Sequence, residues 1–381
     1  MRLESDRVKI TNVKTTVVSL PRAATLTTSY GSGETSTTVL VELFTNEGLT
    51  GIGQTAVAPR SYGETAEGIM ANIQAHLAPA VIGESPREIE RLCRKMHAAL
   101  PHHWSSHAGV EFALWDLTGK ALGVPVYELL GGKVREGVSL MGFVHHDTPD
   151  RMAGHAREAL DEHGYPVLKM KVGLDPREDV ARYRAVAEAV GDRAVLQVDG
   201  NTGYTLVEAI PALTTMERIG GLGAIEQPVE RIEDLAEIAR RLATPVMADE
   251  AIYPPQDAIE VVRRKAASLA LMKITKHGGL LNVQKIAAVF DAAGLTLSAA
   301  IYYDVIAAAA AHFAAATPCV EWPSPYTYLQ DTLLQKPLAP EGLLLRVPAG
   351  PGLGVELDPD KVRQYTVAGP VVGGLKQRLA L

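Results

Sequence analysis

The stretch Val167-Leu-Lys-Met-Lys-Val172 is one of eight short apolar or β-branched runs that alternate with segments of helical spacing. A short apolar run bounded by turn residues indicates a buried strand, and strands alternating with helices indicate βαβ units. Eight strands with seven intervening helices predict an α/β fold, a parallel βα barrel of the TIM type. The eight predicted strands are Gly137–Val144, Val167–Val172, Ala194–Val198, Ala224–Glu226, Val246–Ala248, Ala270–Ile274, Thr296–Ala299 and Pro318–Glu321.

Helix starts in this region follow the rules for capping. Asp175-Pro-Arg-Glu178 places a capping carboxylate before a proline in the first turn, and Pro149 marks the first turn of another helix. Both signals support helices between the predicted strands.

The first 128 residues predict a separate α+β capping domain. Val8–Leu20 and Thr37–Phe44 alternate as strands do, and Thr45-Asn-Glu-Gly48 is a hairpin turn. The expected helices run from Tyr62 to Leu77, from Ser85 onward, and from Ala108 to Leu122 with a stop at Gly123.

We therefore expect three parts: a capping domain over 1–128, a modified barrel over 129–345, and a C-terminal segment over 346–381. The last segment has strand-like pieces and the turn-rich Ala349-Gly-Pro-Gly-Leu-Gly354. We expect it to return to the capping domain and complete it.

Composition excludes several classes of protein. The net charge of −7 argues against a nucleic-acid or anionic-membrane partner, and two cysteines cannot build a disulfide framework. The charged start Met1–Ile10 is unlike a signal peptide, and Val305–Ala316 is too short and too interrupted by His312 for a membrane span. We expect a cytoplasmic protein with a small-molecule partner.

Ionisable residues occur where predicted strands end. Catalytic groups of βα barrels lie at the carboxyl ends of the strands, because the following loops meet at one mouth. The gaps between Lys171, Asp199, Glu226, Asp249 and Lys273 are 28, 27, 23 and 24 residues, each about one strand-helix unit. Lys169 shares the strand of Lys171, and Asp304 and Glu321 are weaker candidates of the same kind.

Three carboxylates at one mouth predict a metal site. Asp199, Glu226 and Asp249 would repel one another without a cation. An all-oxygen set of three protein ligands favours Mg²⁺, with Mn²⁺ as a substitute, over Zn²⁺.

The lysines suggest proton transfer. Lys169 and Lys171 leave their strand on one face, so each should depress the pKa of the other and make a usable base. Lys273 lies roughly opposite in an eight-membered ring; alternatively, it is only a salt-bridge partner of Asp249 or Glu250. A divalent ion flanked by amines suits enolate chemistry on a carboxylate substrate.

The same residues resemble the enolase superfamily, in its muconate-lactonizing (muconate cycloisomerase) subgroup. The motifs are Lys169-Met-Lys171, Asp199-Gly-Asn201, Glu226-Gln-Pro228, Ala248-Asp-Glu250, Lys273-Ile-Thr-Lys-His-Gly-Gly279, Tyr62-Gly-Glu-Thr-Ala-Glu-Gly-Ile69, Glu128-Leu-Leu-Gly-Gly132 and Pro351-Gly-Leu-Gly354. The resemblance implies a capping domain over a modified barrel, Mg²⁺ on the three carboxylates, and Lys171 and Lys273 as the acid/base pair, with Lys169 assisting. It also implies that Asn201 and Glu250 lie beside the metal and that the protein is a symmetric homo-oligomer.

Several positions depart from the subgroup pattern. Asp304 stands where Glu is usual, Gln54 ends a Gly-Ile-Gly-Glu-like motif, and His277 replaces Asn. Leu297–Asp304 lacks the histidine of the mandelate-racemase branch, and Glu321-Trp-Pro323 replaces the Asp-x-Asp pair of many dipeptide epimerases.

Other residues are expected near the substrate. Tyr30, in a closing loop over 23–32, and Tyr302 are candidates to line the pocket. His145 and His146 are either substrate contacts or solvated loop residues.

The leading hypothesis is therefore cycloisomerisation of muconate or a related dicarboxylate. Racemisation or epimerisation of an N-substituted amino acid between two lysines is the alternative, followed by dehydration. A barrel that has lost turnover is disfavoured, since a purely structural barrel needs neither lysine.

Overall fold

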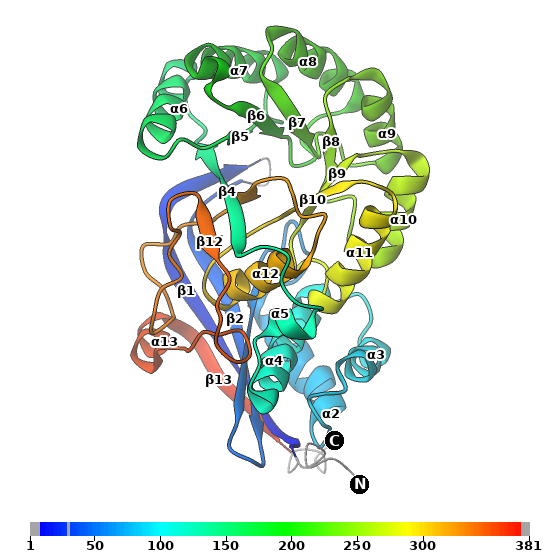
Figure 1. The fold of residues 1–381 in the computed structure, drawn as a ribbon, viewed down its shortest axis with the longest axis vertical. Coiled ribbons are helices and arrows are strands. Elements are labelled where there is room, and N and C mark those ends of the chain that lie inside the picture. The colour runs from blue at the N-terminus through cyan, green and yellow to red at the C-terminus, as the bar shows by residue number, and fades with distance from the viewer. Residues whose placement is uncertain (1–7, 29–30, 375–381) are drawn as a thin grey trace.

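The structure is a computed structural model that describes residues 8–28 and 31–374. Its strands form two separate sheets, and the helices α6 to α11 curve around the larger one (Figure 1). The smaller sheet lies on the opposite side of the molecule from α7 and α8, and it contains the first and last strands of the described chain (Figure 1).

The smaller sheet builds the capping domain. It is antiparallel in the order β13-β1-β2-β3, so the C-terminal strand pairs with the first one, for example Val13 with Gly373. This confirms that the C-terminal segment completes the capping domain. The strands are β1 (Ile10–Thr28), β2 (Gly31–Thr45), β3 (Thr50–Ala56) and β13 (Thr366–Gly374).

The capping helices pack on one another and on this sheet. Gly53 of β3 lies directly against the backbone of Gly109 in α4, where any side chain at position 53 would collide. The helices are α1 (Ala66–Asn72), α2 (Ala78–Val81), α3 (Ile89–Ala99), α4 (Trp104–Leu122) and α5 (Val126–Leu129), with a π-helical turn at Ile73–Leu77.

The larger sheet is the barrel, and its fold class is as predicted. Neighbouring strands from β4 to β10 are parallel and follow chain order. They are β4 (Gly137–Val144), β5 (Val167–Lys171), β6 (Val195–Asp199), β7 (Leu222–Glu226), β8 (Val246–Ala248), β9 (Leu269–Met272) and β10 (Thr296–Ala299). The barrel helices are α6 (Pro149–His163), α7 (Pro176–Val190), α8 (Leu206–Ile219), α9 (Ile232–Arg241), α10 (Pro255–Arg264), α11 (Leu280–Ala292) and α12 (Asp304–Ala316).

The eighth barrel strand is not where the sequence predicted it. The strand is β11 (Ser324–Pro325), which pairs in parallel with β4, whereas the expected run Pro318–Glu321 contributes only a bridge from Val320 to Leu297. A strand of two residues is too short to show any periodicity in the sequence. The apolar run before it, Pro318–Glu321, therefore resembles a strand more than β11 does. β12 (Leu344–Arg346) adds to β4 in antiparallel fashion, and α13 (Pro359–Tyr365) precedes β13.

Capping predictions held at two helices and failed at one. The Asp175 side chain accepts hydrogen bonds from the N–H groups of Arg177 and Glu178 at 2.9 and 3.1 Å, and α6 begins at Pro149 as expected. Ser85 does not cap a helix: the chain makes a turn there and α3 begins at Ile89.

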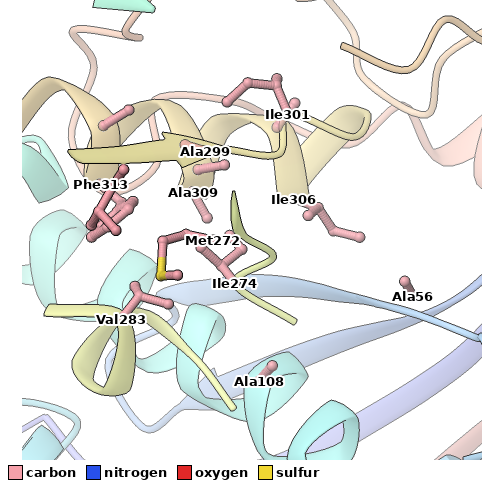
Figure 2. Close-up of a cluster of buried hydrophobic side chains, with 14 of the residues drawn as sticks. Ala56, Ala108, Met272, Ile274, Val283, Ala299, Ile301, Ile306, Ala309 and Phe313 are labelled. Atoms are coloured by element: carbon pink, nitrogen blue, oxygen red, sulfur yellow. The ribbon is translucent and has the colours of Figure 1, made fainter. Parts of the chain in front are cut away.

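One continuous core joins the two parts. Figure 2 shows Met272 and Ile274 beside Ala309 and Phe313 of α12, with Ala108 of the capping helix α4 in the same cluster. The alanines of α12 let this helix pack closely on all sides, since its residues from Asp304 to Ala315 are all buried. Among the described residues, no helix is long and apolar enough to cross a membrane.

Candidate functional site

The strand order places the predicted ionisable residues on consecutive strands of the barrel. In the parallel register Lys171 of β5 lies beside Asp199 of β6, which lies beside Glu226 of β7. Asp249 directly follows β8, and Lys273 directly follows β9. All these groups therefore meet at the carboxyl end of the barrel.

Their side chains touch one another. Lys169 Nζ lies 2.6 Å from Glu226 Oε2 and 2.8 Å from Asp199 Oδ2. Lys171 Nζ donates to Asp199 Oδ2 and to Asn201 Oδ1, both at 2.5 Å. Lys273 Nζ donates to Asp249 Oδ2, so the salt-bridge alternative for Lys273 is present in this structure.

Charge pairing sets the pKa values. Burial alone would raise the pKa of Asp199, but Lys169, Lys171 and Lys273 outweigh it and hold that pKa well below its usual range. Burial raises the pKa of Glu226 to about 8, with a further contribution from the negative charge of Asp199.

The sequence predicts that Lys169 and Lys171 depress each other's pKa, but the pKa of Lys169 is raised in this structure. Burial does act to lower the pKa of Lys169, but Asp199 and Glu226 outweigh it and the pKa rises above its ordinary value. The pKa of Lys273 is likewise raised, because Asp249 and Glu250 outweigh burial. Each of these amines forms an ion pair with a buried carboxylate.

The donor set fits a hard divalent cation in its chemistry. Glu226 and Asp249 have fully buried side chains, and Glu226 Oε1 has no hydrogen-bond partner among the described residues. In this structure the ammonium groups of the lysines balance the negative charge of the three carboxylates. No three His, Cys, Asp or Glu side chains of the described chain are gathered closely enough to hold an ion. An ion at this place would have to displace the lysine contacts.

A cavity of about 700 Å³ opens above these groups. Lys169, Lys171, Lys273 and Asp199 line its floor, whereas Glu226 and Asp249 lie beneath the surface. The capping domain supplies the opposite wall, through Arg22, Arg60 and Tyr62.

Three more predicted residues reach this cavity. Asn201 Nδ2 donates to Glu250 Oε1 at 3.0 Å, and both residues line the cavity. Tyr302 also lines it, and its hydroxyl lies 2.6 Å from the hydroxyl of Tyr62.

Two predicted residues do not reach the cavity. Asp304 is buried at the start of α12, where Oδ1 accepts hydrogen bonds from the Thr332 hydroxyl and, at 3.1 Å, from Leu333 N–H. Glu321 is exposed and precedes β11, so it lies before the strand instead of at its carboxyl end.

The expected closing loop is only partly described. Tyr30 lies outside the described residues. β1 continues to Thr28 and β2 starts at Gly31, so most of the span 23–32 is a two-stranded ribbon.

Sequence reasoning missed the capping-domain residues and the supports behind the ligands. Arg22 and Arg60 have no local signal, because only the fold brings them over the barrel. Lys276 is fully buried and donates to Asp249 O and, at 2.7 Å, to Ile252 O. Its place in the Lys273–Gly279 motif was the only available hint.

Gln54 is a further support. Its Oε1 accepts hydrogen bonds from the N–H groups of Val305 and Ile306 at 3.1 and 3.4 Å, and its Nε2 donates to Thr38 Oγ1. The uncharged amide thus joins β3 and β2 to the start of α12.

Comparison with known proteins agrees with this geometry. Residues 10–131 match the model for the mandelate racemase / muconate lactonizing enzyme N-terminal domain, and residues 151–361 match the model for an enolase C-terminal domain-like fold. The chain is 32% identical over 374 residues to muconate cycloisomerase 1-1 of Acinetobacter lwoffii, covering 94% of this chain and 97% of the relative. It is 29% identical to N-succinyl-L-Arg/Lys racemase of Bacillus cereus, covering 96% and 100%.

Solved structures show the same likeness over the whole chain. Muconate lactonizing enzyme from Pseudomonas fluorescens superimposes with a TM-score of 0.90 at 27% identity, covering 94% of this chain and all of that one. N-succinyl Arg/Lys racemase from Bacillus cereus gives the same TM-score and identity, with 96% and 99% coverage. The family models and the full-length relatives thus agree, and the chain belongs to the enolase superfamily, in its mandelate racemase / muconate lactonizing enzyme family and muconate-lactonizing subgroup.

Proposed function

We propose that this chain is a Mg²⁺-dependent isomerase that forms an enolate from a carboxylate substrate, and that its reaction is cycloisomerisation of muconate or a related dicarboxylate. The observation that carries the proposal is the sequence of charges around the barrel mouth. The three carboxylates at the ends of β6, β7 and β8 are flanked by lysines on β5 and after β9. Full-length similarity to muconate cycloisomerases supports the same reaction.

Asp199, Glu226 and Asp249 would hold the metal, and Mn²⁺ would substitute for Mg²⁺. When bound, the ion supplies positive charge that stabilises negative charge on the substrate carboxylate. Lys169, which contacts two of the three carboxylates, is proposed to add to the positive potential without exchanging a proton.

In cycloisomerisation, one carboxylate oxygen of the diene adds to a double bond, and the carbon left with enolate character gains a proton from a lysine. Lys171 and Lys273 both line the cavity and are the candidates for this proton transfer. Arg22 and Arg60, on the capping side, suit the second carboxylate of such a substrate.

The placement of the two lysines favours a second candidate, 1,1-proton transfer on an N-substituted amino acid. Lys171 ends β5 and Lys273 follows β9, and these strands are four apart in the ring of eight, so the two lysines approach the cavity from opposite sides. One lysine would remove the α-proton and the other would return a proton to the opposite face of the enolate carbon.

Two assays with Mg²⁺ separate these reactions. Loss of the conjugated-diene absorbance of cis,cis-muconate reports cycloisomerisation. Exchange of the α-proton of N-substituted amino acids in D₂O, followed by NMR, reports 1,1-proton transfer. No change in either assay, with metal binding intact, would refute both candidates.

Lysine variants refine the test. In 1,1-proton transfer, Lys171→Ala and Lys273→Ala should each abolish exchange on one face, whereas cycloisomerisation should depend mainly on one of them. Lys336→Ala, an exposed lysine remote from the cavity lining, is the control. We also propose that the protein is a homo-oligomer, which light scattering coupled to size-exclusion chromatography tests.

A further inference from the structure

Gln197 is a buried polar side chain just beneath the carboxyl ends of the barrel strands. It precedes Asp199 by two residues on β6, so both side chains leave the strand on the same face. In the parallel register Gln197 lies beside Lys169 of β5 and Ala224 of β7, whereas Asp199 lies beside Lys171. Gln197 therefore belongs to the layer directly below the proposed catalytic groups, and its side chain has no exposed surface.

The oxygen and the nitrogen of the Gln197 amide both have partners. Oε1 accepts a hydrogen bond from Trp322 Nε1 at 2.7 Å. Nε2 donates to Glu226 Oε2 and lies 3.6 Å from the sulfur of Met247. Because a buried polar atom without a partner is costly, these contacts hold the amide in one place.

Trp322 determines which way round the amide lies. An indole N–H can only donate, so it must face the oxygen of the Gln197 amide. The NH₂ group is then left to face Glu226. A reversed amide would bring two donors together at Trp322 and two acceptors together at Glu226. Trp322 itself precedes β11 and packs against a cluster of buried barrel residues that includes Met247.

The amide holds one oxygen of Glu226 and leaves the other oxygen free. Glu226 Oε2 accepts hydrogen bonds from Lys169 Nζ, at 2.6 Å, and from Gln197 Nε2. Glu226 Oε1 is buried and has no hydrogen-bond partner among the described residues. The carboxylate cannot turn about its axis without losing both donors, so the free oxygen points to a defined place.

We propose that Gln197 is a positioning residue of the metal site, which turns Glu226 so that Oε1 is the oxygen free to bind the cation. Trp322 keeps the Gln197 amide in the orientation that this requires. The inference rests on the metal site of the proposed function. Lys169 does not serve the same purpose, because a cation repels its ammonium group and competes for its contacts, whereas a neutral amide stays in place.

The first test compares the Mn²⁺ affinity of the wild type and Gln197→Met, with electron paramagnetic resonance used to measure the free ion. Methionine is an unbranched side chain of similar length that donates no hydrogen bond. We expect Gln197→Met to bind Mn²⁺ about 10- to 100-fold more weakly, as for the loss of a partner behind a metal ligand. An affinity equal to that of the wild type would overturn the inference.

Ser298→Ala is the matched control for a loss of stability. Ser298 is fully buried on β10, and its hydroxyl donates to Pro323 O, next to Trp322, at 2.9 Å. This variant should lower the free energy of unfolding in urea and leave the Mn²⁺ affinity unchanged. An equal loss of Mn²⁺ affinity in Ser298→Ala would show that Gln197→Met acts by loosening the barrel, and would overturn the inference.

Trp322→Phe tests the role of the indole, and it also serves if Gln197→Met does not fold. Phenylalanine has no N–H, so the amide is held less firmly and Mn²⁺ binding should weaken about 2- to 10-fold. The double variant Gln197→Met/Trp322→Phe should bind no more weakly than Gln197→Met, because Trp322 acts through Gln197. Wild-type affinity in Trp322→Phe, or losses that multiply in the double variant, would overturn the role of Trp322.

Glu226→Gln separates this inference from the proposed function. The variant keeps the shape of the side chain and removes its charge, so it should abolish Mn²⁺ binding. If Glu226→Gln binds Mn²⁺ as the wild type does, the proposed metal site fails, and the inference fails with it. If Glu226→Gln does not bind Mn²⁺ but Gln197→Met keeps the wild-type affinity, the metal site stands and the positioning role of Gln197 fails.

Discussion

Glu111 is expected to make the stability of this protein depend on pH. This carboxylate belongs to α4 of the capping domain and is completely buried. It accepts hydrogen bonds from the N–H groups of Leu280 and Leu281, at 2.9 and 2.8 Å, and from Trp115 Nε1 at 2.8 Å. Because α11 begins at Leu280, Glu111 fastens the end of the Lys273–Gly279 loop to the capping domain.

The size of the effect follows from the pKa. Burial raises the pKa of Glu111 from 4.5 to about 7, although the hydrogen bonds from Leu281 and Leu280 act in the other direction. The folded state therefore binds this proton more tightly than the unfolded state, and stability falls as pH rises from the unfolded to the folded pKa. The difference amounts to about 3 kcal/mol at about 1.4 kcal/mol per pKa unit.

The variant Glu111→Gln tests this directly. An amide has no charge at any pH, so it lacks the titration, but it leaves one or two buried N–H groups poorly paired at a cost of about 1–3 kcal/mol. Urea unfolding followed by fluorescence should show the wild type to be more stable than the variant near pH 5. That advantage should shrink by about 2.5 kcal/mol between pH 5 and pH 8, because part of the proton-linked stability is already lost at pH 5.

An exposed carboxylate serves as the control. Glu67→Gln on α1 removes an exposed acid and should give a small difference from the wild type that does not change over the same pH range. A Glu111→Gln effect that is equally large at both pH values would contradict the raised pKa and the reasoning from burial.

Three further outcomes follow from the structure. Removal of divalent metal with EDTA should abolish turnover in whichever of the two assays is positive, and added Mg²⁺ or Mn²⁺ should restore it; activity that persists without metal would contradict the proposed role of the carboxylates. Lys276→Met should lower stability to urea by about 3–5 kcal/mol, because it leaves Asp249 with one fewer buried cationic partner; a loss under 1 kcal/mol would show that Lys273 alone is sufficient. Gly279→Ala should lower the free energy of unfolding by about 1–3 kcal/mol in thermal denaturation, because φ is +121° and the new methyl group would meet the Glu111 carboxylate. The control Gly154→Ala, in open space on α6, should instead be neutral or stabilising.

The barrel and its strand-end residues could be predicted because both depend on local repetition. Apolar runs alternating with amphipathic helices identify the strands, and regular gaps then place Lys171, Asp199, Glu226, Asp249 and Lys273 at one mouth. These positions follow from parallel pairing alone, without knowledge of any side-chain contact.

What could not be predicted depends on contacts between distant segments. Arg22 reaches the cavity only because the capping domain folds back over the barrel, and β11 is too short to show a pattern. That displacement also explains why the sequence places Glu321 at the mouth, whereas Pro325 and Thr327 are the residues of this segment that line it. Asp304 was expected in the cavity, but the loop at Thr332 and Leu333 takes up its carboxylate.

A crystal structure of the protein soaked with Mn²⁺ and an unreactive carboxylate, with anomalous scattering used to locate the ion, is the most direct measurement. We expect one strong peak between Asp199, Glu226 and Asp249, with the lysine ammonium groups moved off these carboxylates and turned toward the ligand. An ion bound away from the three carboxylates, or Lys171 and Lys273 both turned away from the ligand, would contradict the enolate chemistry proposed for this barrel.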